Sequence, residues 1–401
     1  MRKPRTLVYV GLFGATAVGL AIGQSKLNAA ITRQAVQAPS FEVDPFWPKP
    51  LPNHWIIGST IGVGIDSRDH VFIIHRGAPT MDKRTEVDTS KARPENECCA
   101  AAPPVLEFDP EGNLVNSWGG PGPGYTWPES NHGISVDDKD NVWIGGNGTG
   151  DSHIIKFTHD GKLIKEIGIP GRATNSNSME SFGKVAKITF DVKAQEAYVA
   201  DGYGNKRVAV LDMTSGAIKR YWGAYGEKPD DTPSGPYKPD APLIRQFRNP
   251  VHCAEPTTSG MVYVCDRVND RIQVFTKDGK FVKEVRIAPR TIGDGSVWDI
   301  AFSKDAAQKF MFLADGKNEK VYVMERESLK ILTSFGDAGR QPGQFFAVHS
   351  IATDSKGNVY TTETYEGKRV QKFNYKGLKP VAKENQGVLW PEGKATPAVR
   401  R

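Results

Sequence analysis

A pattern of apolar and polar residues recurs along the chain from about residue 56 onward. Each copy has an apolar strand that ends near Asp, a turn containing Gly or Asn, a second strand, a polar turn, a third strand and, after Asp-Gly or a similar pair, a fourth strand. In the clearest copy these strands cover 132–137, 141–144, 153–157 and 160–167. Short apolar runs bounded by turn residues are typical of β-strands. The pattern therefore predicts an all-β fold.

Six copies of this pattern are present, which decides the architecture. The other five copies begin near Gly62, Val185, His252, Trp298 and His349. Four-stranded repeats of this length are typical of propeller blades, and a single blade cannot bury both of its faces, so the copies have to stack in a ring. We predict a six-bladed β-propeller over 39–385, with segment 41–44 closing the ring as the outer strand of the last blade and a C-terminal tail at 386–401. Two separate β-sandwiches would not produce six copies of one motif.

Residues 1–38 have the pattern of an export segment. A basic start is followed by an apolar run over 6–23 and by small residues at 27–29 and 36–38. A cleaved signal peptide and an uncleaved membrane anchor through residues 6–23 both fit this run, which is at the lower edge of the length that spans a bilayer. We therefore expect an exported protein that is periplasmic, secreted or anchored to the outer face of the membrane, where disulfides are permitted.

The charge distribution bears on the class of partner. The chain has 401 residues, a globular composition and a net charge of +6, which could suggest a nucleic-acid binder. Within 1–38 there are five basic residues and no acidic one, which leaves +1 for the rest of the chain. No basic stripe remains, so we expect a small-molecule or peptide substrate and no nucleic acid. The oligomeric state is not indicated by the sequence.

Three histidines occupy the same place in their repeats. His132, His252 and His349 each open the innermost strand of a blade, in blades two, four and six. Alternate blades of a six-fold ring are related by a third of a turn, so the three side chains can converge in the central tunnel. Three neutral imidazoles with an open position are the ligand set of a catalytic zinc. One such histidine would more often pair with a backbone group, but three at equivalent positions favour a zinc site.

The repeats resemble those of the NHL-repeat propellers, on segments such as Asp201-Gly-Tyr-Gly-Asn-Lys-Arg-Val208 and Asp266-Arg-Val-Asn-Asp-Arg-Ile-Gln273. Over residues 55–380 the motifs also resemble the lyase domain of the peptidylglycine alpha-amidating enzymes. That six-bladed propeller splits a peptidyl-alpha-hydroxyglycine into a peptide amide and glyoxylate. The resemblance implies that the three histidines hold zinc.

The same resemblance implies roles for three further residues. Tyr203, in the Asp-Gly-Tyr turn, corresponds to the active-site tyrosine, and Arg267 and Arg76 correspond to arginines that face the substrate. A phenol exchanges protons near neutral pH only beside a cation or a metal, and arginine holds a carboxylate through paired hydrogen bonds. Taken singly, a tyrosine in a glycine-rich turn and an arginine after a strand-end aspartate are more often structural.

The chain departs from the lyase pattern at three positions. Ala347 stands in place of a methionine, and Gly204 in place of a disulfide cysteine. Ser350 stands in place of an aspartate that binds structural calcium, so a calcium ion is in doubt, as is the fit of the lyase substrate.

The cysteines and the remaining histidines are less informative. Cys253 and Cys265 lie on adjacent strands of one hairpin and can form a disulfide. Cys98 and Cys99 are neighbours in a long loop of the first blade, where free thiols, a redox pair and additional metal ligands all remain open. We treat the histidines outside the triplet as surface or structural residues, with His75 kept apart because it precedes Arg76; the others are His54, His70, His153 and His159.

These features lead to one main functional hypothesis. The chain is expected to be an exported, zinc-dependent lyase that cleaves the carbon–nitrogen bond of an alpha-hydroxylated amide to give an amide and glyoxylate. The alternative is a non-catalytic NHL propeller that binds a protein or peptide on its loop face. A third hypothesis is hydrolysis of the kind catalysed by propeller lactonases, but those enzymes use mainly carboxylate-bound calcium, whereas the tunnel positions here are histidines.

Overall fold

The computed structural model describes residues 36–87, 97–172 and 174–381. Residues 1–35 of the expected export segment and the tail at 386–401 lie outside this part of the chain. Among the described residues, no helix combines the length and the apolar character that crossing a membrane requires.

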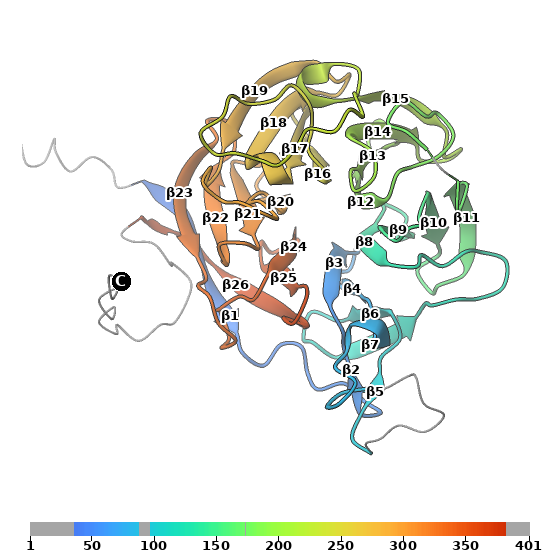
Figure 1. The fold of residues 1–401 in the computed structure, drawn as a ribbon. Coiled ribbons are helices and arrows are strands. Elements are labelled where there is room, and N and C mark those ends of the chain that lie inside the picture. The colour runs from blue at the N-terminus through green and yellow to red at the C-terminus, as the bar shows by residue number, and fades with distance from the viewer. Residues whose placement is uncertain (1–35, 88–96, 173, 382–401) are drawn as a thin grey trace, which may run out of the picture.

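The described residues form six four-stranded antiparallel sheets. These sheets surround a central axis, as Figure 1 shows. Blades one to three are β3 (Thr60–Ile65), β4 (Val71–His75), β6 (Val105–Phe108) and β7 (Leu114–Trp118); β8 (Asn131–Val136), β9 (Val142–Gly146), β10 (His153–Phe157) and β11 (Leu163–Gly168); and β12 (Val185–Asp191), β13 (Glu196–Asp201), β14 (Arg207–Asp212) and β15 (Ile218–Trp222). Blades four and five are β16 (Val251–Pro256), β17 (Met261–Asp266), β18 (Arg271–Thr276) and β19 (Phe281–Arg286); and β20 (Asp299–Phe302), β21 (Phe310–Asp315), β22 (Lys320–Glu325) and β23 (Lys330–Phe335).

The sixth blade closes the ring with a strand from the start of the described chain. Its own strands are β24 (Val348–Thr353), β25 (Val359–Glu363) and β26 (Arg369–Pro380), and the outer strand is β1 (Gln37–Asp44). β1 pairs antiparallel with β26, with Val43 opposite Phe373. The predicted six-bladed all-β fold and the predicted closing role of segment 41–44 are both confirmed.

Burial follows the position of each strand in its blade. The inner strands β3 and β8 are almost wholly buried, whereas the outer strand β11 has three exposed residues at its start. Apolar side chains of neighbouring blades pack against each other. Between blades five and six, for example, Phe41, Phe312 and Phe335 are in ring contact at centroid distances of 5.2 and 5.3 Å. The core therefore lies between the blades, which explains why one blade alone would not be stable.

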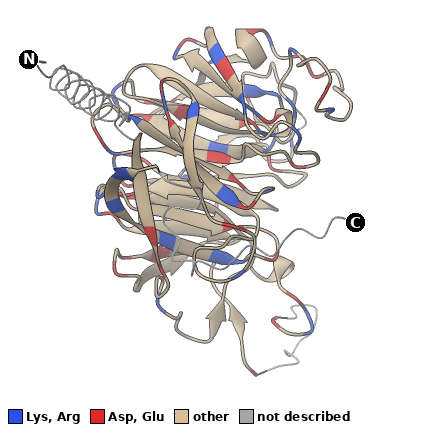
Figure 2. Cartoon of the chain, turned by 90° about the vertical axis from the view of Figure 1, so that its left-hand side faces the viewer, with Lys and Arg blue, Asp and Glu red and all other residues tan. Residues whose placement is uncertain are grey.

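The repeat signature builds a buried ion pair within a blade. Arg207 Nε donates to Asp201 Oδ2 at 2.8 Å in blade three, and Arg271 Nε donates to Asp266 Oδ2 at 2.7 Å in blade four. All four side chains are fully buried. On the side of the molecule drawn in Figure 2, Lys and Arg are interspersed with Asp and Glu along the strands.

Both cysteine pairs are disulfide-bonded. Cys253 on β16 and Cys265 on β17 face each other across the hairpin and are bonded, as predicted. Cys98 and Cys99 are bonded to each other, so in this structure they are neither free thiols nor metal ligands. Directly after this pair, β5 (Ala100–Ala101) runs parallel to β2 (Trp55–Ile56).

Candidate metal centre and active site

The three histidines of alternate blades meet in the tunnel. His132 lies on β8, His252 on β16 and His349 on β24, and each is at most 2% exposed. Their ring centroids are 4.8 to 5.2 Å apart, and their ligating atoms all lie within 4.8 Å of one another. The convergence expected from the repeat positions is therefore present.

Backbone carbonyls fix the orientation and the tautomer of all three rings. Each Nδ1 donates to a carbonyl at the start of the next blade around the ring: His132 to Ala186 O (2.7 Å), His252 to Trp298 O (2.5 Å) and His349 to Ile61 O (2.7 Å). A carbonyl can only accept, so Nδ1 carries the hydrogen and Nε2 keeps its lone pair. Burial lowers the pKa of each imidazole well below 6.5, which holds the rings neutral. Neutral imidazoles with an oriented second nitrogen are typical of metal ligands.

Tyr203 completes the group. It follows β13, and its hydroxyl lies 2.9 Å from His132 Nε2 and 3.1 Å from His252 Nε2. Gly202 makes this approach possible, because a Cβ there would lie 2.0 Å from the carbonyl oxygen of Val251. The phenol has one proton for two acceptor nitrogens, and His349 Nε2 faces the same space. Lone pairs outnumber protons, so the donor set fits a metal cation.

Arg267 lies beside the Tyr203 phenol, and one of its guanidinium donors has no hydrogen-bond partner. Nη1 donates to Tyr203 Oη at 3.3 Å, and Nη2 lies 3.5 Å from Asp294 Oδ1. The guanidinium stacks over Trp298, with Cζ 4.6 Å from the ring centroid. Nε is buried and has no partner. Since Asp266 pairs with Arg271, as in the repeat signature, Arg267 is left available to the tunnel.

Arg76 directly follows β4 and is held by two asparagines. Nη2 donates to Asn147 Oδ1 at 2.8 Å and Nε to the Asn131 carbonyl at 3.3 Å. Burial lowers the pKa of Arg76, and the charge interaction with Tyr203 partly offsets this effect by raising the pKa. A cavity of about 610 Å³ adjoins Arg76 and is also lined by Ser59, Thr80 and Tyr365.

His75 lies outside this group. Its Nδ1 accepts from the backbone N–H groups of Gly58 (3.1 Å) and Gly77 (3.0 Å), and its Nε2 donates to Pro103 O at 2.9 Å. Burial lowers its pKa to about 4. His75 is therefore a structural residue that fixes the backbone at Gly77, next to Arg76, and ties it to Gly58.

The residues that support the two arginines are not apparent from the sequence. Trp298 stands at the repeat position equivalent to the histidines, yet its carbonyl orients His252 and its ring carries Arg267. Asn131 directly precedes His132, so its place at the opening of an inner strand is a signal that could have identified it. The contact of Asn147 depends on the packing of two blades, which no local motif reports.

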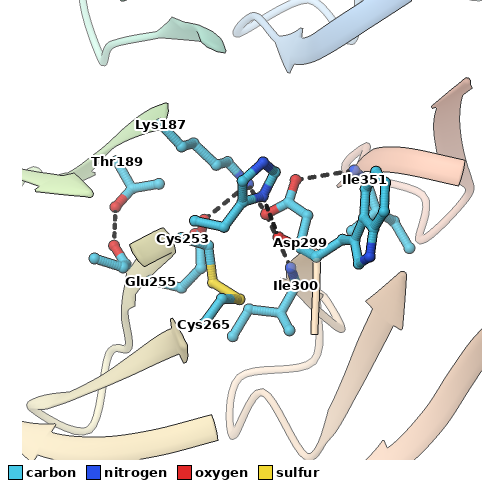
Figure 3. Close-up of a disulfide and its surroundings, with 11 residues drawn as sticks. Lys187, Thr189, Cys253, Glu255, Cys265, Asp299, Ile300 and Ile351 are labelled. Carbon is cyan, nitrogen blue, oxygen red and sulfur yellow. Dashed lines mark hydrogen bonds and ion pairs between the residues drawn. A yellow bond between two sulfur atoms is a disulfide. The ribbon is translucent and has the colours of Figure 1, made fainter. Parts of the chain in front are cut away.

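Further along the tunnel, the residues do not fit a structural calcium ion. Ser350 Oγ donates to Ile61 O at 2.8 Å, in the place where the lyase pattern has a carboxylate. Lys187 Nζ lies 2.7 Å from Asp299 Oδ1 and 2.8 Å from Glu255 Oε1. Figure 3 shows these three side chains together. The two carboxylates are already paired with an ammonium group, which would repel a divalent cation. The calcium that the resemblance placed in doubt has no suitable ligand set at this position.

Comparisons with known proteins agree with this architecture. No protein-family model matches the chain. The chain is 26% identical over 357 residues to NHL repeat-containing protein 3 of Mus musculus, covering 84% of this chain and 85% of that protein. It is 24% identical over 359 residues to peptidylglycine alpha-amidating monooxygenase of Rattus norvegicus (85% of this chain, 34% of that protein). It is equally identical over 359 residues to peptidyl-alpha-hydroxyglycine alpha-amidating lyase 1 of Drosophila melanogaster (84% and 60%).

A solved structure supports the fold alone. A streptogramin B lyase structure superposes with a TM-score of 0.50 at 13% identity, covering 84% of this chain and 98% of that one. Together with the six-bladed ring, the sequence matches show that the chain is an NHL-repeat β-propeller that resembles the lyase domain of the peptidylglycine alpha-amidating enzymes.

Proposed function

We propose that the protein is a zinc-dependent lyase that cleaves the carbon–nitrogen bond of an alpha-hydroxylated amide, releasing an amide and glyoxylate. The observation that carries the proposal is the convergence of three imidazoles, each with a free lone pair on Nε2 because its Nδ1 donates to a backbone carbonyl, with the Tyr203 hydroxyl against two of these Nε2 atoms. Relatives that include an amidating lyase support it.

His132, His252 and His349 would hold the metal. Three nitrogen ligands with an open position suit zinc, which binds imidazole at roughly 2.0–2.1 Å. When bound, such an ion supplies a Lewis acid that polarises the hydroxyl oxygen of the substrate.

Tyr203 is the group that moves the proton. In the phenolate form, stabilised by the Arg267 guanidinium at 3.3 Å, it takes the proton of the substrate hydroxyl. The electron pair of that O–H bond forms the new carbonyl, and the electron pair of the breaking carbon–nitrogen bond goes to nitrogen. Tyr203 then returns the proton to that nitrogen, so the phenolate is regenerated and atoms and charge balance.

The two arginines orient the substrate. Arg267 has an unpartnered Nε and is positioned by the Trp298 ring, so it can bind the carboxylate of a hydroxyglycine unit through paired hydrogen bonds. Arg76 contributes the second positive charge, and the cavity beside it has room for the remainder of the substrate.

A non-catalytic NHL propeller is the second candidate. It is favoured by the match to NHL repeat-containing protein 3, which extends over 85% of that protein's length. The tunnel would then hold an inert metal, and the loop face would bind a protein or peptide. A calcium-dependent hydrolase is less well supported, because the tunnel carboxylates Asp299 and Glu255 are paired with Lys187.

The test combines metal content with product release. Purified protein is expected to contain zinc in the tunnel, the His132→Ala/His252→Ala variant is expected to lose it, and the control His54→Asn, at an exposed histidine with a left-handed backbone, to keep it. Zinc-loaded protein is expected to release glyoxylate from alpha-hydroxyhippurate, whereas the Tyr203→Phe variant is expected to bind zinc and release none. Zinc without any glyoxylate release would favour the second candidate.

We also propose export, since the two disulfides suit an oxidising compartment. Recovery of the protein from the cytosolic fraction, with its cysteines reduced, would contradict this.

A further inference from the structure

A second cluster of metal-ligating side chains lies at the opposite end of blade one. Ile61, whose carbonyl binds His349, lies at the start of β3, and Asp66 follows the end of β3 in the turn that also contains His70. Glu107 reaches the cluster from β6, and His159 reaches it from the turn between β10 and β11 of blade two. The side chain of Asp66 is fully buried, and that of Glu107 is 2% exposed.

The spacing within the cluster is that of a compact ligand set. His159 Nε2 lies 3.3 Å from Asp66 Oδ2 and 3.2 Å from Glu107 Oε1, and His70 Nδ1 lies 2.6 Å from Glu107 Oε1. Neighbouring ligand atoms of a tetrahedral zinc are about 3.3 Å apart, given zinc–ligand distances of roughly 2.0–2.1 Å. The ligating atoms of Asp66, His70 and Glu107 all lie within 4.8 Å of one another, and His159 Nε2 lies beside both carboxylates, so the cluster is formed by two blades.

The equivalent place in blade two is built differently. There the turn aspartate, Asp137, accepts from Asn141 Nδ2 at 3.1 Å and lies 3.1 Å from Lys156 Nζ. Lys156 holds the position of Glu107, directly before the phenylalanine of the third strand, and Asn141 holds that of His70. In blade two the turn aspartate is therefore surrounded by an amide donor and an ammonium group.

Blade six has the same residue types as blade two at these positions, although Lys372 Nζ donates to Pro110 O there. Asn358 Nδ2 donates to Asp354 Oδ2 at 2.7 Å, and a lysine, Lys372, again precedes the phenylalanine of the third strand. The residue equivalent to His159 in blade four is Lys277, which forms an ion pair with Asp191, the turn aspartate of blade three. His70, Glu107 and His159 are thus possible metal ligands at positions where other blades have an amide donor or a cation. The equivalent residues are Asn141 and Asn358 for His70, Lys156 and Lys372 for Glu107, and Lys277 for His159.

Arg68 is the cation that occupies the cluster. Its Nη2 lies 2.9 Å from Asp66 Oδ2, 3.3 Å from Glu107 Oε1 and 2.5 Å from His159 Nε2. Unlike the lysines of the sister blades, Arg68 enters from the solvent side, and its side chain is 53% exposed. It can therefore turn outward without leaving a cavity in the core.

We propose that Asp66, His70, Glu107 and His159 bind a zinc ion that displaces the Arg68 guanidinium and joins blade one to blade two. Two imidazoles and two carboxylates form a ligand set that zinc accepts in tetrahedral geometry. His70 and His159, treated as surface or structural residues on sequence grounds, are ligands of this site. The proposal does not depend on the lyase function.

The test counts zinc in the full chain after equilibrium dialysis against zinc chloride. The Glu107→Lys/His70→Asn variant reproduces the arrangement of blade two and is expected to fold, as circular dichroism would verify. It is expected to bind one zinc fewer than the wild type, whereas His132→Ala/His252→Ala is expected to keep the zinc at this cluster. An unchanged count in the Glu107→Lys/His70→Asn variant would overturn the proposal.

A second variant tests the displacement of the guanidinium. Arg68→Ala removes the competing cation, so zinc binding at this cluster is expected to tighten by up to about fivefold, the range of a solvent-exposed ion pair. Titration calorimetry with zinc chloride in the His132→Ala/His252→Ala background measures zinc binding at this cluster alone, because the tunnel site is removed. Unchanged or weaker binding after Arg68→Ala would contradict the displacement.

Discussion

Replacing Lys187 by methionine tests whether the buried ammonium group of Lys187 stabilises the folded propeller. Lys187 lies on the inner strand β12 and bridges Glu255 of blade four and Asp299 of blade five, at 2.8 and 2.7 Å. The Lys187 side chain is 12% exposed, and those of Asp299 and Glu255 are 1% and 14% exposed. Asp299 Oδ2 also accepts from the backbone N–H of Ile351 in blade six, so four blades meet at this network.

The magnitude follows from the loss of one partner of a buried pair. Methionine keeps the volume of the stem but leaves two carboxylates without a cation, which costs about 3–5 kcal/mol of unfolding free energy. Burial already raises the pKa of Glu255 to about 7 and raises that of Asp299. Groups with a raised folded-state pKa lose stability as pH rises, so the cost is expected to be largest at pH 8 and smaller at pH 5, where the carboxylates accept protons.

Urea unfolding of the wild type and of Lys187→Met at pH 5 and pH 8 measures this cost. Lys162→Met is a matched control, because the Lys162 side chain is 80% exposed, and its effect is expected to stay within about 0.5 kcal/mol. Adding Asp299→Asn to Lys187→Met is expected to restore part of the stability at pH 8. An equal loss at pH 5 and pH 8, or no loss at either, would refute the electrostatic reasoning.

Three further predictions concern single residues. Asp270 is buried with one unpartnered oxygen and a pKa raised to about 7, so Asp270→Asn is expected to be more stable than the wild type at pH 8 by up to about 4 kcal/mol and equal to it near pH 4, measured by urea unfolding. An equal stability of the two proteins at pH 8 would contradict this. The pKa of His75 is lowered to about 4, so stability that is complete above pH 6.5 is expected to fall by about 3 kcal/mol as the pH drops to 4, and His75→Gln is expected to flatten that slope in unfolding curves; an unchanged slope would show that other groups cause it. Arg267→Lys keeps the charge but loses the paired donors, so kcat/KM for alpha-hydroxyhippurate is expected to fall about 10- to 100-fold with zinc content unchanged, whereas undiminished kcat/KM would remove Arg267 from the site.

Local periodicity is what made the fold predictable. Each blade is contiguous in the chain apart from the closing strand β1, and the same register recurs in every copy, so equivalent positions such as His132 and His252 can be recognised from the spacing of the repeats alone. Because the inner strands line the tunnel, the equivalent positions of the three histidines also predicted that their side chains converge there.

Contacts between blades were not predictable in the same way. Lys187 and Asp299 are far apart in the sequence, and neither carries a motif, so their pairing depends on the closed ring. His159 meets Asp66 through the packing of two turns from adjacent blades. The contact of Arg76 with Asn147 is of the same kind. Which side chains meet in this way depends on how neighbouring blades pack, and the sequence pattern of a single repeat contains no information on that packing.

Glyoxylate release by zinc-loaded protein, compared between the wild type and Tyr203→Phe, tests the central claim most directly. The account predicts release from alpha-hydroxyhippurate by the wild type and none above background by Tyr203→Phe at equal tunnel zinc, because the phenol is the group that carries the proton between oxygen and nitrogen. Equal release by the two proteins, or no release by a wild type whose tunnel histidines hold zinc, would contradict it.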